Sequence, residues 1–131
     1  MARYELIDNP SGNLGSPRTD RPWCWQHPVV DGVVPFAAAG DLIASQDVTG
    51  LTHVSFVVTN TGGAGATHTY TYQGSPDGVL WADLGTDAGV AVGAVASHVE
   101  TALAYRFVRI RAQETALGAN STATAWITGT R

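Results

Sequence analysis

The sequence contains no lysine and only one cysteine, and both facts narrow what the protein can be. Seven arginines supply all of its positive charge against eleven acidic residues, so the formal net charge is −4 at pH 7. Proteins that hold a phosphate backbone usually present a basic surface, so we expect no nucleic-acid partner. Cys24 has no second cysteine with which to form an intramolecular disulfide, and we expect it to be a small, buried apolar side chain.

Long apolar runs are also missing. No stretch approaches the roughly 20 apolar residues of a membrane span, and residues 1–12 lack the apolar core of a secretory signal. We therefore expect no membrane partner and no Sec-type export. The chain has 131 residues, of which 44% are hydrophobic, and this suits one folded domain with its own core.

Residues 1–50 differ from the remainder because they contain five of the six prolines. Proline interrupts helices and central strands, so we expect this segment to be extended or looped. It nevertheless carries Trp23, Trp25 and Phe36, which something must cover. Two interpretations remain open: edge strands that fold back on the protein's own core, or an arm that docks on a neighbouring subunit. The expected division is an N-terminal arm and edge segment over residues 1–50 and a sandwich core over 51–131.

From Leu51 onward, apolar and polar residues alternate with a period of two, which is typical of half-buried strands. If the first two strands pair as a hairpin across the glycine-rich residues 61–66, Phe56 shares a face with the tyrosines of the second. We expect the last strand to pair with the one before it, and we leave residues 85–97 open between strand and loop. The expected strands are residues 51–60, 67–74, 79–84, 105–112 and 121–128.

No segment shows the stripe of an amphipathic helix, so the fold class that we predict is all-β. The expected architecture is an antiparallel β-sandwich, jelly-roll-like, with an extended proline-rich N-terminal arm.

Residues that carry chemistry do not form a recognisable catalytic or metal-binding pattern. The four histidines are scattered, and His53 and His68 would need a third ligand even if paired strands brought them together. The G-x-S-x-G pattern of a nucleophile elbow is absent, and residues 62–65 do not form a phosphate loop. A pair of glycosidase carboxylates would not be visible in a sequence. We therefore expect no catalytic residue, no metal, no cofactor and no enzymatic activity.

Arginines and tryptophans are the more informative residues. For Arg106, Arg109 and Arg111 on one predicted strand, we favour pairing with neighbouring acids or contact with a partner subunit over an anion site. For the four tryptophans, we favour packing in the core or in an interface over a sugar-stacking platform.

One constellation extends beyond composition. Ser75, Asp77, Gly78 and Trp81 form an S-x-D-G-x-x-W turn between two strands, and residues 105–111 follow it as Y-R-F-V-R-I-R. This order resembles two groups of proteins. The first is the small β-sandwich proteins of tailed-phage virions, which are head decoration (cement) proteins and related tail and baseplate modules. The second is the discoidin-like, galactose-binding jelly rolls. In both, the Asp-Gly pair reverses the chain and the tryptophan folds back onto the sheet.

The lack of a signal and of a cysteine pair favours the phage resemblance. It implies a virion structural protein, a decoration protein that binds over capsomers as a dimer or trimer. The implied partners are the major capsid protein and the protein itself, on the exterior of a capsid assembled in the bacterial cytoplasm. Trp23, Trp25 and Phe36 would dock the arm, and Arg109 and Arg111 would make polar contacts. The alternatives are a carbohydrate-binding jelly roll, with a host-surface glycan as ligand, and a tail or baseplate component.

Overall fold

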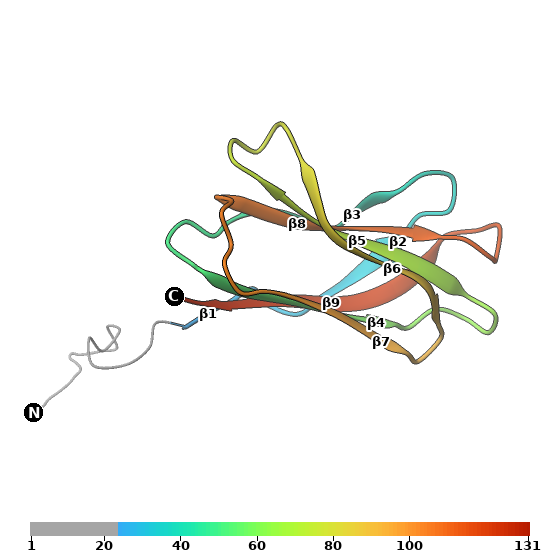
Figure 1. Ribbon diagram of the computed structural model, residues 1–131. Coiled ribbons are helices and arrows are strands. Elements are labelled where there is room, and N and C mark those ends of the chain that lie inside the picture. The colour runs from blue at the N-terminus through green and yellow to red at the C-terminus, as the bar shows by residue number, and fades with distance from the viewer. Residues whose placement is uncertain (1–23) are drawn as a thin grey trace, which may run out of the picture.

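The computed structural model describes residues 24–131, which form nine β-strands and no helix (Figure 1). None of the described residues therefore belongs to a helix that could cross a membrane. In chain order the strands are β1 (Cys24–Gln26), β2 (Val30–Val34), β3 (Gly40–Asp47), β4 (His53–Asn60), β5 (Thr67–Ser75), β6 (Ala82–Ala91), β7 (Val95–Glu100), β8 (Phe107–Glu114) and β9 (Ser121–Thr130).

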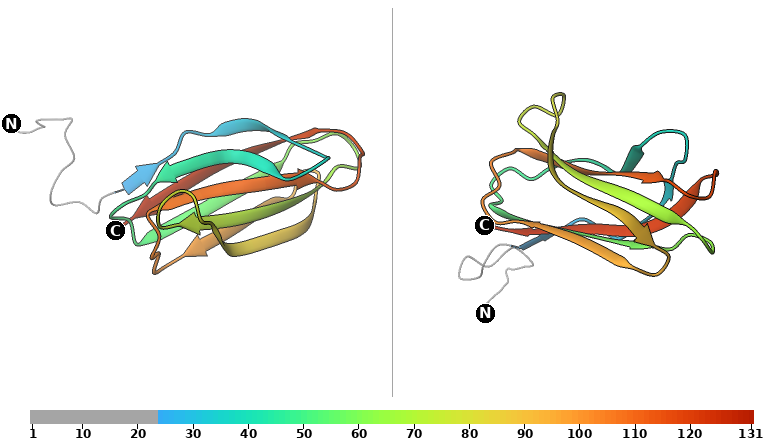
Figure 2. Two further views of the ribbon diagram at one scale, coloured as in Figure 1. Left: turned by 90° about the horizontal axis from the view of Figure 1, so that it is seen from above. Right: turned by 45° about the vertical axis from the view of Figure 1, so that its right-hand side comes forward.

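The strands form two antiparallel sheets that face each other (Figure 2). In the β9 sheet, β4 lies between β9 and β7, while β1 and β2 both pair with the other side of β9. In the β8 sheet the order is β3-β8-β5-β6. The pairs β2·β9, β3·β8, β4·β7 and β5·β6 are nested inside one another, which is the topology of a jelly roll. The predicted fold class, an antiparallel and jelly-roll-like sandwich, is confirmed.

The core fills the space between the sheets, and the period-two pattern assigns its residues. Val54, Phe56 and Val58 of β4 are buried against Tyr70 and Tyr72 of β5, and the rings of Phe56 and Tyr72 lie 5.2 Å apart. Alternate residues of β8 and β9 are buried in the same way. Each strand therefore gives one face to the core and the other to solvent.

The predicted strand pairing was wrong in two places. Residues 51–60 and 67–74 do not form a hairpin, because β4 belongs to the β9 sheet and β5 to the β8 sheet. Likewise β9 pairs with β1, β2 and β4, and not with β8. The physical reason is the same in both cases. The apolar faces of consecutive strands meet across the core. The chain therefore crosses from one sheet to the other where we expected neighbouring strands of one sheet.

The stretch that begins at residue 79 also differs from the prediction. β6 starts only at Ala82, and Val79 and Leu80 lie in the connection before it, where both are exposed. The Asp77 carboxylate binds the backbone N–H groups of both residues and so holds them in the turn. Residues 85–97, which the sequence left open, are the end of β6, a turn, and the start of β7.

The described part of the proline-rich segment packs on the protein's own core. Strands β1, β2 and β3 pair with β9 and β8, and Val34, Leu42 and Ile43 are buried. Residues 24–50 thus follow the edge-strand interpretation, while the arm proper and Trp23 lie outside the described residues. Cys24 is exposed, contrary to expectation, because its neighbour Trp25 occupies the inward position on β1.

Candidate interaction surface on the β8 sheet

No group of three or more His, Cys, Asp or Glu side chains within residues 24–131 could hold a metal ion. His53 and His68 lie on strands of different sheets. His98 instead contacts Glu100, with 2.6 Å between its Nε2 and the Glu100 Oε2, and stacks on Tyr72 with ring centroids 5.3 Å apart. The stacked rings join β5 of the β8 sheet to β7 of the β9 sheet.

His68 and Glu114 form a fully buried pair that the sequence did not reveal. The His68 Nε2 lies 3.1 Å from Oε1 of Glu114, and the Nδ1 of the same ring lies 2.6 Å from the Tyr70 hydroxyl. The other carboxylate oxygen of Glu114 accepts backbone N–H groups from Thr67 and from two residues beyond the end of β8. Neither side chain is accessible to solvent, so the pair belongs to the interior of the sandwich.

The outward side of β8 carries the arginines that the sequence singled out. Alternate residues of this strand, Arg109 and Arg111 among them, point away from the core. Neighbouring strands place Gln73 and Asp41 beside them, and Trp81 and Asp83 lie just before and within β6. We call these six residues the β8 face.

Arg109 is held in place by Trp81 and Gln73. Its guanidinium carbon lies 4.0 Å from the ring centroid of Trp81, and its Nε donates a 2.7 Å hydrogen bond to the side-chain oxygen of Gln73. The Gln73 amide nitrogen in turn donates to Asp83 at 2.7 Å. Trp81 therefore lies on the outer face of the sheet, and a continuous chain of contacts orients its ring and the guanidinium.

Arg111 is fixed by contacts of its own. Its Nη1 donates to the Asp41 carboxylate at 3.0 Å, and its Nη2 donates to the Ala39 carbonyl at 2.8 Å. The Nη1 of Arg109 lies 3.9 Å from the same Asp41 oxygen. Partial burial lowers the pKa of Arg109, and Arg111 lowers it too, whereas Asp41 raises it. Two arginines and two aspartates balance the formal charge of the β8 face.

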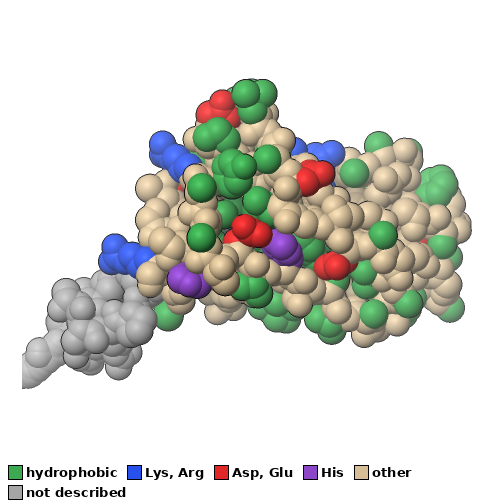
Figure 3. Space-filling model, in the orientation of Figure 1, with side chains coloured by type: hydrophobic (Ala, Val, Ile, Leu, Met, Phe, Trp, Pro, Cys, Tyr) green, Lys and Arg blue, Asp and Glu red, His purple; other side chains and the backbone are tan. Residues whose placement is uncertain are grey.

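The turn that precedes Trp81 is stabilised by its own side chains. The Ser75 hydroxyl oxygen accepts the N–H of Gly78 at 2.8 Å, and the Asp77 carboxylate accepts those of Val79 and Leu80 at 2.8 and 3.0 Å. These backbone hydrogen bonds, the one from Leu80 first, lower the pKa of Asp77. The turn projects from the sandwich, and Figure 3 shows hydrophobic and acidic side chains together at its tip.

Replacing Gly78 by alanine tests this turn. Gly78 has a φ of 80°, which L-residues rarely adopt, although a β-carbon there would meet nothing closer than 3.8 Å. We expect a loss of about 1 kcal/mol in the free energy of unfolding from backbone strain alone. The matched control is Gly63→Ala, at an unstrained position with open space around it, which we expect to cost nothing. Urea denaturation measures both, and equal stabilities for the two variants would contradict the role given to Gly78.

The remaining candidate interface residues do not form one cluster. Phe36 lies in the connection between β2 and β3 with 40% of its surface exposed, and its carbonyl accepts a 3.0 Å hydrogen bond from Gln113 of β8. Phe36 therefore lies beside the outward side of β8, at the end of the strand that is farther from Trp81. Trp25 belongs to the opposite sheet and packs at the margin of the core. The structure therefore brings Arg109, Arg111 and Trp81 together and places Trp25 elsewhere.

Solved structures with a similar fold come from several sources. The "PBSX exported protein XepA" matches with a TM-score of 0.62 at 16% identity, over 80% of this chain and 36% of that one, so this chain spans about a third of its length. A subunit of Bacillus endospore appendages, described as disulfide-linked pili, matches with a TM-score of 0.51 at 21% identity, over 91% and 98%. Infectious bursal disease virus, Gx strain, matches with a TM-score of 0.51 at 12% identity, over 85% and 32%.

At these identities the likeness shows a shared fold. No curated protein matches the chain in sequence. One family model does match: that of a domain of unknown function, DUF6385, over residues 47–131. The matched residues comprise most of the sandwich, from the end of β3 through β9, and include Arg109, Arg111 and the whole turn from Ser75 to Trp81. The chain belongs to the DUF6385 family.

Proposed function

We propose that this protein is a structural component of a phage virion, a decoration protein that binds the outside of an assembled capsid and stabilises it. In this proposal the chain is made in the cytoplasm of a bacterial host, and its partners are the major capsid protein and other copies of itself. Its function requires no reaction. Each bound copy adds contact area that is lost only when capsomers separate, so many copies stabilise the shell by mass action.

The observation that carries the proposal is the contact between Trp81 and Arg109 beside an exposed apolar tip. Tryptophan and arginine are the residue types most enriched among those that dominate binding energy in protein interfaces. Next to them in the chain, Val79 and Leu80 are 76% and 71% exposed, although both are apolar. An ordered Trp–Arg pair bordered by exposed apolar side chains matches the composition of a protein-docking surface.

The rigidity of the β8 face supports the same proposal. Arg109 is already bonded to Gln73 and Arg111 to Asp41, so these long side chains lose little freedom when a partner binds. Both arginines stand on a strand paired on either side, with β3 and β5. A face ordered before binding and neutral in formal charge suits contact with a second protein surface better than capture of a small anion.

The fold is suited to assembly. Jelly rolls recur in viral capsids and in lectins. Among the solved structures of similar fold, the endospore appendages are pili and infectious bursal disease virus is a virus particle. These likenesses support a structural role for the present chain, while the choice of a phage capsid rests on the turn and arginine pattern of its sequence.

Substitutions on the β8 face test the proposal. We expect Trp81→Ala and Arg109→Ala each to weaken binding to empty shells of the major capsid protein from the same genome by about tenfold or more. Arg106→Ala is the matched control, because Arg106 lies outside the β8 face and its guanidinium contacts the exposed Asp47. Co-sedimentation over a range of protein concentrations gives the three affinities.

Other outcomes would redirect the proposal. Undiminished binding by the Trp81 and Arg109 variants would contradict the β8 face as the docking surface. Binding to purified tails or baseplates instead of shells would identify a tail component. Binding to a glycan array that is lost in Trp81→Ala or Trp126→Ala would support the carbohydrate-binding alternative.

A further inference from the structure

The outward side of the β9 sheet is unusually poor in charge. Its two central strands, β4 and β9, contain no Asp, Glu or Arg, and the chain has no lysine. Every second residue of these strands points outward, from His53 to Thr59 in β4 and from Thr122 to Thr130 in β9. Besides His53, these residues are threonines, one serine, Val57 and Trp126. We call these positions, with the outward residues of β7 and β2, the neutral face.

The register shows that the neutral face is continuous. Val57 lies opposite Trp126 on one side and Ser97 on the other, and Ser55 lies opposite Thr128 and Val99. At its margins Val33, Val95 and Val99 are 59%, 64% and 57% exposed. Among the described residues at outward positions of this sheet, Asp31 of β2 is the acidic one, and it lies at the edge, where it accepts a 2.6 Å hydrogen bond from the Thr124 hydroxyl.

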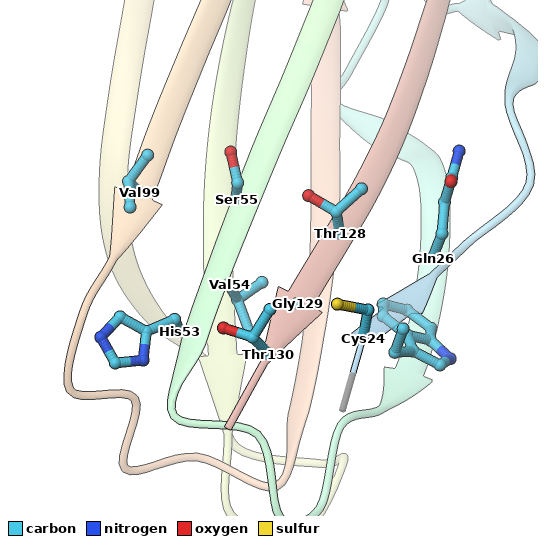
Figure 4. A pocket seen from close by; sticks show the side chains of 10 residues that line it. Cys24, Gln26, His53, Val54, Ser55, Val99, Thr128, Gly129 and Thr130 are labelled. Carbon is cyan, nitrogen blue, oxygen red and sulfur yellow. The ribbon is translucent and has the colours of Figure 1, made fainter. Parts of the chain in front are cut away.

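One end of the neutral face is hollowed. Figure 4 shows this groove, with Cys24 and Gln26 of β1 beside Thr128 of β9, and with Ser55 and Val99 further across the sheet. Its volume is about 420 Å³. Trp126 occupies the outward position of β9 that adjoins Thr128, so the largest side chain of the neutral face lies next to this groove.

We infer that the neutral face binds the same face of a second copy of this chain. In a twofold dimer the same patch lies on both sides of the contact and residues near the axis meet their own counterparts, so charges at the centre of the face would bring like charges together. This chain carries a net charge of −4, and the neutral face avoids the repulsion because its central strands carry none of that charge. A hollow adjacent to a bulky ring is self-complementary under the same symmetry.

The size of the face is sufficient for this contact. Four strands spaced about 4.8 Å apart give a width of about 19 Å, and four steps of about 6.8 Å between outward residues give a length of about 27 Å. The plane is on the order of 500 Å², and the relief of the side chains adds to it. A specific interface should bury at least about 1,000 Å² in total, which is about 500 Å² from each partner. Exposed valines and a tryptophan in a face with little charge match the more apolar composition of homodimer interfaces.

This dimer deepens the proposed function and rests on it in one respect, because that proposal already names other copies of the chain as partners and the dimer assigns the face through which they meet. Packing through the two β9 sheets leaves both β8 faces uncovered, on opposite sides of the pair. A bivalent particle of this form could hold two neighbouring capsomers together, with the avidity that two linked sites provide.

Light scattering tests the inference. The wild-type protein is expected to have twice the 13.7-kDa chain mass, and Val57→Glu is expected to halve that mass by placing like charges at the centre of the contact. The matched control is Thr69→Glu at an outward position of β5 in the other sheet, which should remain dimeric. Because little charge lies in the contact, the dimer should persist from about 0.05 M to about 1 M salt.

Thr59→Glu, at the next outward position of β4, repeats the test if Val57→Glu does not fold. A monomeric wild-type protein would overturn the inference, as would an oligomer unchanged by both substitutions, or a monomer that binds neutral glycans through Trp126. The test separates this inference from the proposed function, since Arg109→Ala should lose shell binding and remain a dimer.

Discussion

Replacing Glu114 by alanine is expected to lower the free energy of unfolding by about 3 kcal/mol or more. The carboxylate is fully buried, and its Oε2 accepts the backbone N–H groups of Thr67, Ala116 and Leu117 at 3.2, 2.9 and 3.0 Å. Removing it leaves three N–H groups without that acceptor and takes the carboxylate from beside His68. A hydrogen bond to a charged acceptor contributes about 1.5–3 kcal/mol, and Glu114→Ala removes three of them.

Urea denaturation of the variant measures this loss. The matched control is Glu100→Ala, because Glu100 also contacts a histidine but is partly exposed, and we expect its removal to cost about 1 kcal/mol or less. Equal free energies of unfolding for the two variants would contradict the stabilising role given to Glu114 and its hydrogen bonds.

The same pair makes stability depend on pH. Burial lowers the pKa of His68 below its ordinary value of 6.5, and Glu114 offsets only part of that effect. The unfolded chain therefore takes up the His68 proton more readily than the folded one, and stability declines as the pH falls below about 6.5. Burial opposes the ionisation of Glu114, but the hydrogen bonds from Ala116, Leu117 and Thr67 outweigh it and hold its pKa below 4.5. Its contribution is present above about pH 4.5 and is lost as the pH falls further. In His68→Gln, the free energy of unfolding should decline less between pH 6.5 and 5 than in the wild-type protein, because the contribution of His68 is removed.

Replacing Phe56 by alanine is expected to cost about 4 kcal/mol, within the usual range for a buried phenylalanine. Phe56 is fully buried in the β9 sheet, and its ring lies 5.2 Å from that of Tyr72 in the β8 sheet and 6.1 Å from that of His98. The substitution therefore removes a contact between the two layers and opens a cavity that the paired strands around it cannot readily close.

The control for Phe56 is Phe36→Ala, since Phe36 is partly exposed in a connecting loop. Its truncation should cost about 1 kcal/mol or less. Chemical denaturation with a common slope for both variants would give the difference. A loss below about 2 kcal/mol for Phe56→Ala would mean that the contact between the sheets lies elsewhere in the core.

Period-two alternation was enough to divide the residues of the last strand between its two faces. Ala123, Ala125 and Ile127 share one face of β9, and all three are buried. The alternation could not predict which strands are neighbours, because the pattern along a strand is the same whether its apolar face meets the next strand across the core or lies beside it. In a jelly roll consecutive strands alternate between sheets, and the local signals contain nothing of that arrangement.

The candidate site, too, could be predicted only in part from the sequence. The turn residues from Ser75 to Trp81 are close in sequence, and the chemistry of proline, aspartate and glycine marks them directly. The contact between Trp81 and Arg109 joins residues 28 positions apart and depends on the pairing of β5 with β8. His68 and Glu114 were missed for the same reason, although each shares the parity of buried neighbours on its strand. That parity was the signal that could have identified them as buried polar residues.

The neutral face could not be identified from composition alone, because it depends on which strands are neighbours. The absence of charge in residues 53–60 and 121–130 is visible in the sequence. It indicates a surface only once β4 and β9 are known to pair along their whole length, with Val57 opposite Trp126.

The most direct test of the proposed role is co-sedimentation of the wild-type protein with empty shells of the major capsid protein from the same genome. A decoration protein should move with the shells, reach a fixed number of copies per shell at saturation, and raise the temperature at which the shells fall apart. Protein that stays in the supernatant at every concentration, while the shells disassemble at an unchanged temperature, would contradict the proposed role.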